Sequence, residues 1–144
     1  MADATLSDTY VAAVQHDLAN LPPDATLVGV VRSPTPWFHA AVDENVPELG
    51  PPEELLERVK RTEENLKMRG ICGEEAHNIA WERAEFARSY REHLESSSAA
   101  QSAIAALEGR LDAGESIALV CYENTEKKRC HRTILRDTLE HARR

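Results

Sequence analysis

The sequence predicts a small α/β protein, a single domain in which a mostly parallel sheet is flanked by helices. Two short apolar segments, TLVGVVR at residues 26–32 and SIALVCY at residues 116–122, are typical of strands buried on both faces. Helical patterns occupy much of the chain between them. Strands separated by helices usually pair in parallel through right-handed crossovers, so both segments are expected at the centre of one sheet. A chain of 144 residues fits one such domain.

The N-terminal residues contain no clear element before the first buried strand. We expect residues 1–8 to form a flexible tail and residues 9–144 to form the α/β domain. Residues 9–14 fit two patterns, because their apolar spacing continues as a helix whereas TYVAAV taken alone is typical of a strand. Both alternatives remain open, and the prolines at 22–23 end either element before the strand begins.

Most of the remaining chain is predicted to be helical. Residues 33–52 hold five of the seven prolines and are expected to form a long loop. The apolar spacing then predicts helices over residues 53–68, over 74–95, where the apolar face is broadest, and over 99–111. After the second buried strand and a polar loop, residues 130–142 are expected to form the last helix.

Charge is unevenly distributed along the chain. The formal net charge is −8, but residues 1–126 carry a net −13 and residues 127–144 a net +5. An acidic protein repels phosphates at long range, so general nucleic-acid binding is disfavoured. The basic C-terminal segment can still hold one small anion, or it can simply be the solvated face of a helix.

The sequence indicates a cytoplasmic protein. The longest apolar runs, at 27–31 and 117–122, are far shorter than the roughly 20 residues that span a bilayer, so no membrane association is expected. The first twenty residues carry three aspartates and no Lys or Arg, which argues against a secretory signal. Three cysteines do not make a disulfide framework, and a reducing compartment is expected. The sequence leaves the oligomeric state open.

Polar side chains gather after both buried strands, where ligands bind in open α/β sheets. These segments are residues 32–39 and 123–132. The candidate ligand-binding residues are Arg32, Trp37, Glu123 and Arg132. Arginines and a helix N-terminus recruit anions, so the expected partner is a small anionic ligand such as a phosphate or nucleotide-like molecule, held on a positive island that includes Arg129. Alternatively, Trp37 covers the core together with Phe38.

Cys130 and His131 are the candidate catalytic residues. Cys130 is expected at the start of the last helix, beside several cations, and both features favour the thiolate. A nucleophilic or redox cysteine is therefore chemically reasonable there. Equally, Cys130 can be a buried residue that starts the helix, and His131 can cap or orient rather than catalyse. Burial would raise the pKa of the thiol and oppose the helix and the cations.

Metal and phosphatase motifs are weaker interpretations of the same segment. Cys121, Cys130 and His131 offer soft ligands, but the chain lacks the paired spacing and the four ligands of an ordinary zinc site, so no metal and no cofactor is expected. Cys121 alone is explained as a small core residue. Cys130 and Arg136 have the C-x5-R spacing of cysteine phosphatases, but no glycine between them would let the backbone curl around a phosphate.

Four stretches resemble the family called domain of unknown function 488. They are VVRSPTPWF at 30–38, PELGPPEELLERVK at 47–60, FARSYREHL at 86–94 and ALVCYENTEKKRCHR at 118–132. The last is the most specific, since it joins a buried strand ending in Cys121, Glu123 and the Cys-His-Arg that opens a helix. The resemblance covers residues 9–142. It implies an α/β fold and favours an edge or flanking strand at residues 9–14, but it implies no activity.

Two functional hypotheses follow, and the sequence leaves open whether the protein is an enzyme. The first is an enzyme or small-anion binder with Arg32, Glu123 and Arg132 around Cys130. The second is a non-catalytic structural or interaction module in which Cys-His-Arg fastens the strand to the helix. Convergence of Arg32 and residues 130–132 into one cleft would favour the first. A buried and fully paired Arg132 would favour the second.

Overall fold

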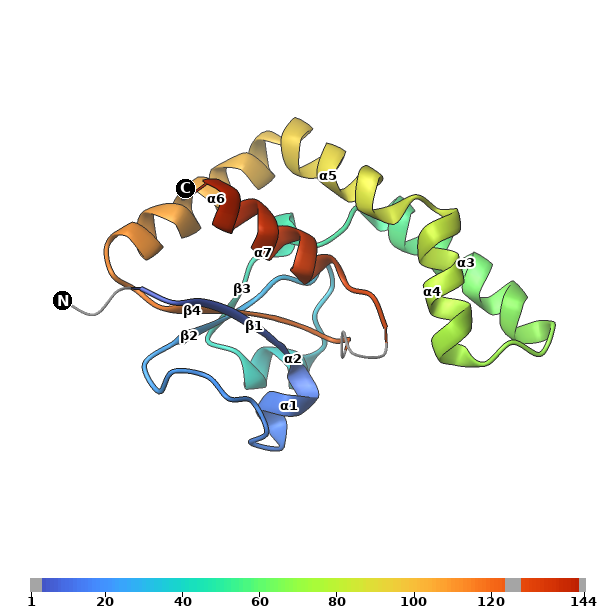
Figure 1. Ribbon diagram of the computed structural model, residues 1–144, viewed down its shortest axis with the longest axis horizontal. Helices are drawn as coiled ribbons and strands as arrows, with labels where there is room; N and C mark the ends of the chain where they lie inside the picture. The colour runs from blue at the N-terminus through green and yellow to red at the C-terminus, as the bar shows by residue number, and fades with distance from the viewer. Residues whose placement is uncertain (1–3, 124–127, 143–144) are drawn as a thin grey trace.

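A four-stranded, all-parallel sheet forms the centre of the computed structural model, which describes residues 4–123 and 128–142 (Figure 1). The strands are β1 (Leu6–Tyr10), β2 (Thr26–Gly29), β3 (Glu44–Asn45) and β4 (Ile117–Cys121), in the order β1-β4-β2-β3. β2 and β4 are the two inner strands and pair with each other, with Leu27 opposite Ala118. The predicted α/β class and the central position of both apolar strands are confirmed.

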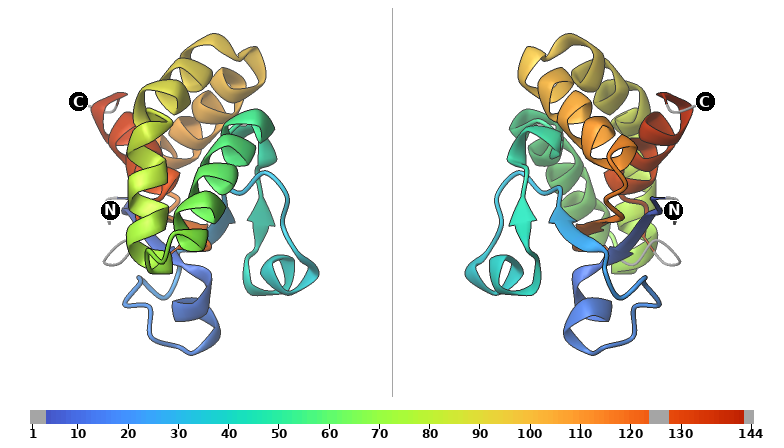
Figure 2. Two further views of the ribbon diagram at one scale, coloured as in Figure 1. Left: turned by 90° about the vertical axis from the view of Figure 1, so that its right-hand side faces the viewer. Right: turned by 90° about the vertical axis from the view of Figure 1, so that its left-hand side faces the viewer.

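Helices cover both faces of this sheet (Figures 1 and 2). They are α1 (Val11–Gln15), α2 (Pro36–Ala41), the short 3₁₀ helix η1 (Pro47–Leu49), α3 (Glu53–Met68), α4 (Gly73–Arg83), α5 (Phe86–Ser96), α6 (Ser98–Asp112) and α7 (His131–Ala142). The larger core joins the sheet to α3–α7, and a smaller one joins it to α1 and α2. In the described part of the chain, no helix is long and apolar enough to span a membrane.

The N-terminal boundary of the domain differs from the expected one. Residues 6–8, assigned from the sequence to a flexible tail, lie in β1, where Leu6 is opposite Ile117 of β4. Residues 1–3 of that tail lie outside the described residues. Residues 9–14 are divided between the two alternatives, because Thr9 and Tyr10 complete β1 and the next residues form α1. The strand forms because it pairs with the edge of β4 that β2 does not occupy. The local sequence LSDTY carries no pattern that predicts this pairing.

The expected long loop at residues 33–52 contains α2, β3 and η1. The side chain of Thr35 accepts a hydrogen bond from the backbone N–H of Phe38, and Pro36 occupies the first turn of α2, so capping starts this helix within a proline-rich segment. Asn45 accepts a hydrogen bond from Val31 N–H and donates one to its carbonyl. These contacts hold the segment beside the end of β2.

The helix expected over residues 74–95 is two helices. α4 ends at Arg83, and Glu85 has a φ of 49°, in the left-handed region that ends a helix. The change of direction brings Trp81 and Phe86 into a stacked contact with ring centroids 3.7 Å apart. In an uninterrupted helix these two rings would point about 140° apart around the axis, so the break lets both helices bury aromatic side chains in one core.

Tyr90 fastens α5 to the segment before α3, and its loss has a measurable expected effect. Its side chain is buried, and its hydroxyl donates to the Leu49 carbonyl at 2.5 Å. We expect Tyr90→Phe to lower the free energy of unfolding by about 1–3 kcal/mol, because a buried carbonyl loses its hydrogen bond. Urea denaturation measures the loss, and Tyr10→Phe, at a half-buried strand end, is the control. Equal losses in the two variants would contradict the prediction.

Candidate functional site

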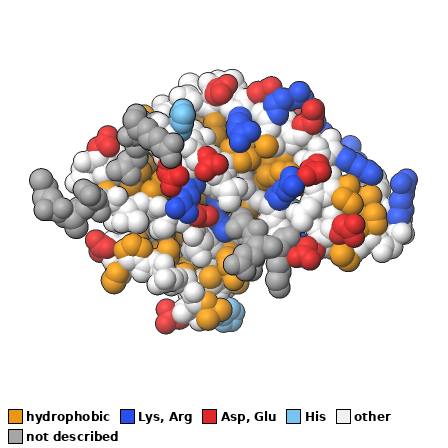
Figure 3. Space-filling view, in the orientation of Figure 1, with side chains coloured by type: hydrophobic (Ala, Val, Ile, Leu, Met, Phe, Trp, Pro, Cys, Tyr) orange, Lys and Arg blue, Asp and Glu red, His pale blue; other side chains and the backbone are white. Residues whose placement is uncertain are grey.

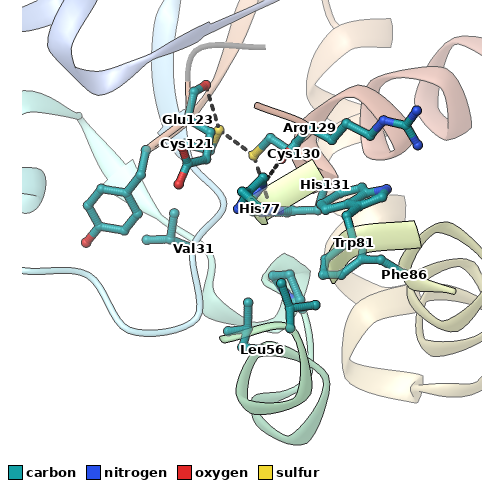
Figure 4. A pocket seen from close by; sticks show the side chains of 13 residues that line it. Val31, Leu56, His77, Trp81, Phe86, Cys121, Glu123, Arg129, Cys130 and His131 are labelled. Carbon is teal, nitrogen blue, oxygen red and sulfur yellow. Dashed lines mark hydrogen bonds between the residues drawn. The ribbon is translucent and has the colours of Figure 1, made fainter. Parts of the chain in front are cut away.

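Two cysteines meet where β4 ends and α7 begins (Figure 4). Cys121 is the last residue of β4, and Cys130 is the residue directly before α7. Both are free and buried, and their sulfurs are 2.6 Å apart although nine positions separate them in sequence. The end of β4 and the start of α7 therefore bring the two thiols into contact.

Cys130 lies in surroundings that favour its thiolate. Burial raises the pKa of this thiol, but the hydrogen bond from Cys121, the hydrogen bond from the backbone N–H of Arg132 and the charge of Arg132 together bring it below the ordinary value. A backbone N–H at the start of α7 is one of the unpaired donors that a helix offers to an anion. The hydrogen bond from Cys121, with the N–H and the charge of Arg132, thus outweighs burial at this sulfur.

Cys121 has the opposite tendency. Burial raises its pKa, and the hydrogen bond to Cys130 raises it further. Its sulfur also accepts a hydrogen bond from Nη1 of Arg132 at 3.0 Å. A protonated Cys121 can then donate its S–H to the Cys130 thiolate, so the pair holds one negative charge and one proton between two sulfurs.

His131 is held in one orientation by the end of the neighbouring strand. Its Nε2 lies 2.5 Å from the carbonyl oxygen of Val30, and a carbonyl can only accept, so Nε2 carries the proton. Burial lowers the pKa of His131, which keeps the ring neutral. Its unprotonated Nδ1 faces the Cys130 sulfur at 3.5 Å. Tyr90 packs edge-on against the ring, which restricts its rotation.

Arg132 is buried and paired. Only 3% of the residue is exposed, its Nε donates to the Asp8 carboxylate at 2.7 Å, and its Nη1 donates to the Glu123 carbonyl at 2.5 Å. Asp8 also accepts a hydrogen bond from Arg136. Arg132 thus links β1, the end of β4 and α7, which meets the criterion stated above for a structural role. The same guanidinium touches the Cys121 sulfur, so it also sets the charge around the two thiols.

The other candidate ligand-binding residues lie in different surroundings. Arg32 donates to the carbonyls of Gly50 and Pro51, and its Nη2 lies 3.5 Å from Nε2 of His93. Trp37 is half exposed on α2, edge-on to Tyr122 with ring centroids 5.6 Å apart, whereas its neighbour Phe38 is buried in the smaller core.

Arg129 is exposed and pairs with Glu82 at 2.7 Å. Each of the three arginines of the expected positive island therefore bonds to its own set of partners. On the face in Figure 3, basic and acidic side chains are interspersed over the described surface. The anion site remains a prediction. Of the residues expected to bind an anion, Glu123 and Arg129 line a pocket next to the thiols.

That pocket has a volume of about 130 Å³ and opens beside both sulfurs. Its wall is largely apolar and comes from the ends of β2 and β4, from α3 and α4 and from the start of α5. The lining residues are Val31, Pro51, Leu56, Val59, His77, Trp81, Phe86, Cys121, Tyr122, Glu123, Arg129, Cys130 and His131. No motif in the sequence connects residues 56–86 with the thiols. The aromatic residues at 81 and 86 are the one feature that could indicate a pocket wall, and they are equally typical of a hydrophobic core.

Helix α4 also positions the backbone that leads into Cys130. Nε2 of His77 donates to the Arg129 carbonyl at 2.9 Å, and the side-chain oxygen of Asn78 accepts from the Arg129 N–H at 3.1 Å. These bonds hold the residue before Cys130 at both of its backbone polar groups. Among the described residues, no three His, Cys, Asp or Glu side chains are arranged to hold a metal ion.

Comparison with known proteins identifies the family of the chain. A family model described as DUF488-N3a, active DUF488-N3 subclade, matches residues 10–143, which includes both cysteines and Cys-His-Arg. No curated protein and no solved structure matches the chain. The match covers nearly the whole domain, and on this ground the chain belongs to the DUF488 family, in the subclade DUF488-N3a.

Proposed function

We propose that the protein is a thiol-dependent enzyme whose site lies at the carboxyl end of β4, with Cys130 as the nucleophile. The environment of the Cys130 sulfur is the observation that carries this proposal: a neighbouring thiol, a backbone N–H at a helix start and a neutral histidine all contact it. Activated cysteine nucleophiles are recognised by a lowered thiol pKa and by an adjacent base that a third group holds in one orientation.

Each of the surrounding groups has a role in this proposal. Nδ1 of His131 is the base beside the Cys130 sulfur, and the Val30 carbonyl keeps that atom unprotonated by accepting the hydrogen bond of the other nitrogen. Cys121 donates a hydrogen bond to the thiolate. Arg132 is a positioning residue, because its contacts with Asp8 and the Glu123 carbonyl fix the strand end and the helix start relative to each other.

The pocket favours a small electrophile with short, largely uncharged substituents. Its wall includes Trp81, Phe86 and Leu56, and its volume of about 130 Å³ admits only a few heavy atoms beside the sulfurs. A small anion receives less support, because Arg32 and Arg132 already bond to carbonyl or carboxylate oxygens. A purely structural role for Cys-His-Arg is the competing interpretation, supported by the burial of Arg132.

Competitive alkylation separates the two interpretations. At neutral pH we expect iodoacetamide to label Cys130 at least about tenfold faster than Cys72 or Cys121, because the alkylation rate follows the thiolate fraction and the pKa of Cys130 is lowered. Cys72 is exposed, so accessibility favours it and makes it a stringent comparison. Mass spectrometry of partly alkylated native protein gives the order of labelling.

The control is the same labelling in denaturant, where the three cysteines should react at similar rates. A variant with Cys72→Ser confirms that the fast site belongs to the buried pair. If Cys72 is labelled first and Cys130 stays protected until the protein unfolds, the enzymatic proposal fails and Cys-His-Arg is a structural fastening.

A further inference from the structure

We propose that Cys121 and Cys130 form a redox pair that reduces small, uncharged organic disulfides entering the pocket between α4 and the end of β4. This inference rests on the proposed function, since it takes Cys130 as the attacking thiol and adds both the substrate class and the second cysteine. The contact between the two sulfurs, on the wall of one pocket, carries it.

The geometry of the pair suits the formation of an internal disulfide. The sulfurs are 2.6 Å apart, and a disulfide bond is about 2.05 Å long, so bond formation requires a movement of roughly half an ångström. Hydrogen bonds hold the backbone at both cysteines. Residue 121 is paired with Tyr10 in the sheet, and the residue before Cys130 is bonded to His77 and Asn78.

The reaction balances without any further reactant. The Cys130 thiolate attacks one sulfur of the substrate R–S–S–R, the substrate S–S bond breaks, and the leaving R–S⁻ takes the proton of Cys121. The resulting Cys121 thiolate attacks the Cys130 sulfur of the mixed disulfide and displaces the second R–S⁻. That thiolate leaves the pocket and is protonated by water. The protein dithiol is oxidised by two electrons to a disulfide, and the substrate is reduced to two R–SH.

Arg132 supports the second step of this sequence. Its Nη1 contacts the sulfur of Cys121, which is the group that must become a thiolate only after Cys130 has reacted. A fixed cation 3.0 Å from that sulfur stabilises the developing negative charge in a buried setting. Its bonds to Asp8 and Glu123 hold it in place through the reaction.

The class of substrate follows from the pocket. The two thiols share a wall with Trp81 and Phe86, which favour short apolar arms on either side of the substrate sulfur atoms. Glu123 and Arg129 also line the pocket, and because Arg129 is already paired with Glu82, the charge of Glu123 disfavours anionic arms. Peptide disulfides held inside folded proteins are too large for about 130 Å³.

A single-turnover experiment tests the inference with bis(2-hydroxyethyl) disulfide as the probe and the Cys72→Ser chain as the protein. That substitution removes an exposed thiol that lies outside the site. We expect each chain to release two molecules of 2-mercaptoethanol, to lose the mass of two hydrogen atoms and to give a Cys121–Cys130 linked peptide after digestion. The matched variant Cys121→Ser, in the same background, should stop at a mixed disulfide on Cys130 and release only one.

The possible outcomes distinguish the inference from the proposed function. If the chain with both cysteines stops at the Cys130 mixed disulfide, the redox pair is disproved while Cys130 remains the nucleophile. If Cys130 does not react with the probe and is also protected from iodoacetamide, the proposed function fails as well. The result with both cysteines present decides the inference even if Cys121→Ser does not fold.

Discussion

Replacement of Asp8 by alanine is expected to lower the free energy of unfolding by about 3–5 kcal/mol, the loss typical of breaking a buried ion pair from one side. The Asp8 side chain is 12% exposed and accepts hydrogen bonds from both Arg132 and Arg136, and the Arg132 side chain is 4% exposed. Without the carboxylate, the guanidinium of Arg132 stays buried and loses the hydrogen-bonded charge that faces its Nε. Urea denaturation of the variant and the unchanged protein measures the difference.

Glu82→Ala is the matched control, because it removes an ion pair of the opposite kind. Glu82 pairs with Arg129 at 2.7 Å, but both side chains are more than half exposed, and such pairs contribute at most about 1 kcal/mol. The large difference between the two variants is the expected result. An equally small loss in Asp8→Ala would show that residue 8 behaves as part of a tail, as the sequence had suggested.

The N-terminal strand shows where sequence reasoning is limited. The inner strands β2 and β4 were predictable because continuous β-branched and apolar runs are typical of strands buried on both faces. β1 has no such run. Its identity depends on register with β4 and on the ion pair between Asp8 and Arg132, whose partners are 124 positions apart in sequence. Contacts at that separation leave no periodic signal in the local sequence.

The helices show a related limit. The apolar spacing over residues 74–95 is nearly continuous, and neither glycine nor proline marks the break between α4 and α5. The chain turns at Glu85, which adopts a left-handed conformation because both flanking helices gain tertiary packing from it. Tertiary contacts thus override a local pattern that on its own favours one helix.

The candidate site was predictable in part. Cys130 and His131 stood out because cations and a helix start surround a cysteine, and the structure brings them together with Cys121. Cys121 itself had been interpreted as a core residue or a weak metal ligand, since a sequence does not show which strand end faces which helix start. The pocket wall from α3 and α4 also carries no motif, so only the fold associates Trp81 with the thiols.

Arg132 combines the two hypotheses that the sequence had set against each other. Its burial and its bond to Asp8 are structural features, whereas its contact with the Cys121 sulfur is electrostatic. A fixed cation beside a reactive sulfur has to be held by other groups, because a mobile one would lose part of its effect to solvent. The structural fastening is therefore what allows the same residue to support thiol chemistry.

Cys121→Ala is expected to slow the alkylation of Cys130 by about 10- to 100-fold at pH values where the Cys130 thiolate is the minor form in the variant. A hydrogen bond to a charged group contributes about 1.5–3 kcal/mol, and alanine cannot replace the one that Cys121 donates to the Cys130 thiolate. The sign follows from the charge: loss of a donor destabilises the thiolate, raises the pKa of Cys130 and moves its pH–rate profile to higher pH.

Iodoacetamide labelling of Cys130 from mildly acidic to alkaline pH measures this shift, with Cys72 as the internal reference for reagent concentration and pH. Cys121→Ser is the matched control, because a hydroxyl still donates to the thiolate and should keep the profile close to that of the unchanged protein. Thermal unfolding checks that both variants fold. If the alanine and serine variants have the same profile as the unchanged protein, the low pKa of Cys130 comes from the start of α7 and Arg132 alone. Cys121 would then have no effect on the pKa of Cys130 before the reaction, and would act only after Cys130 has reacted.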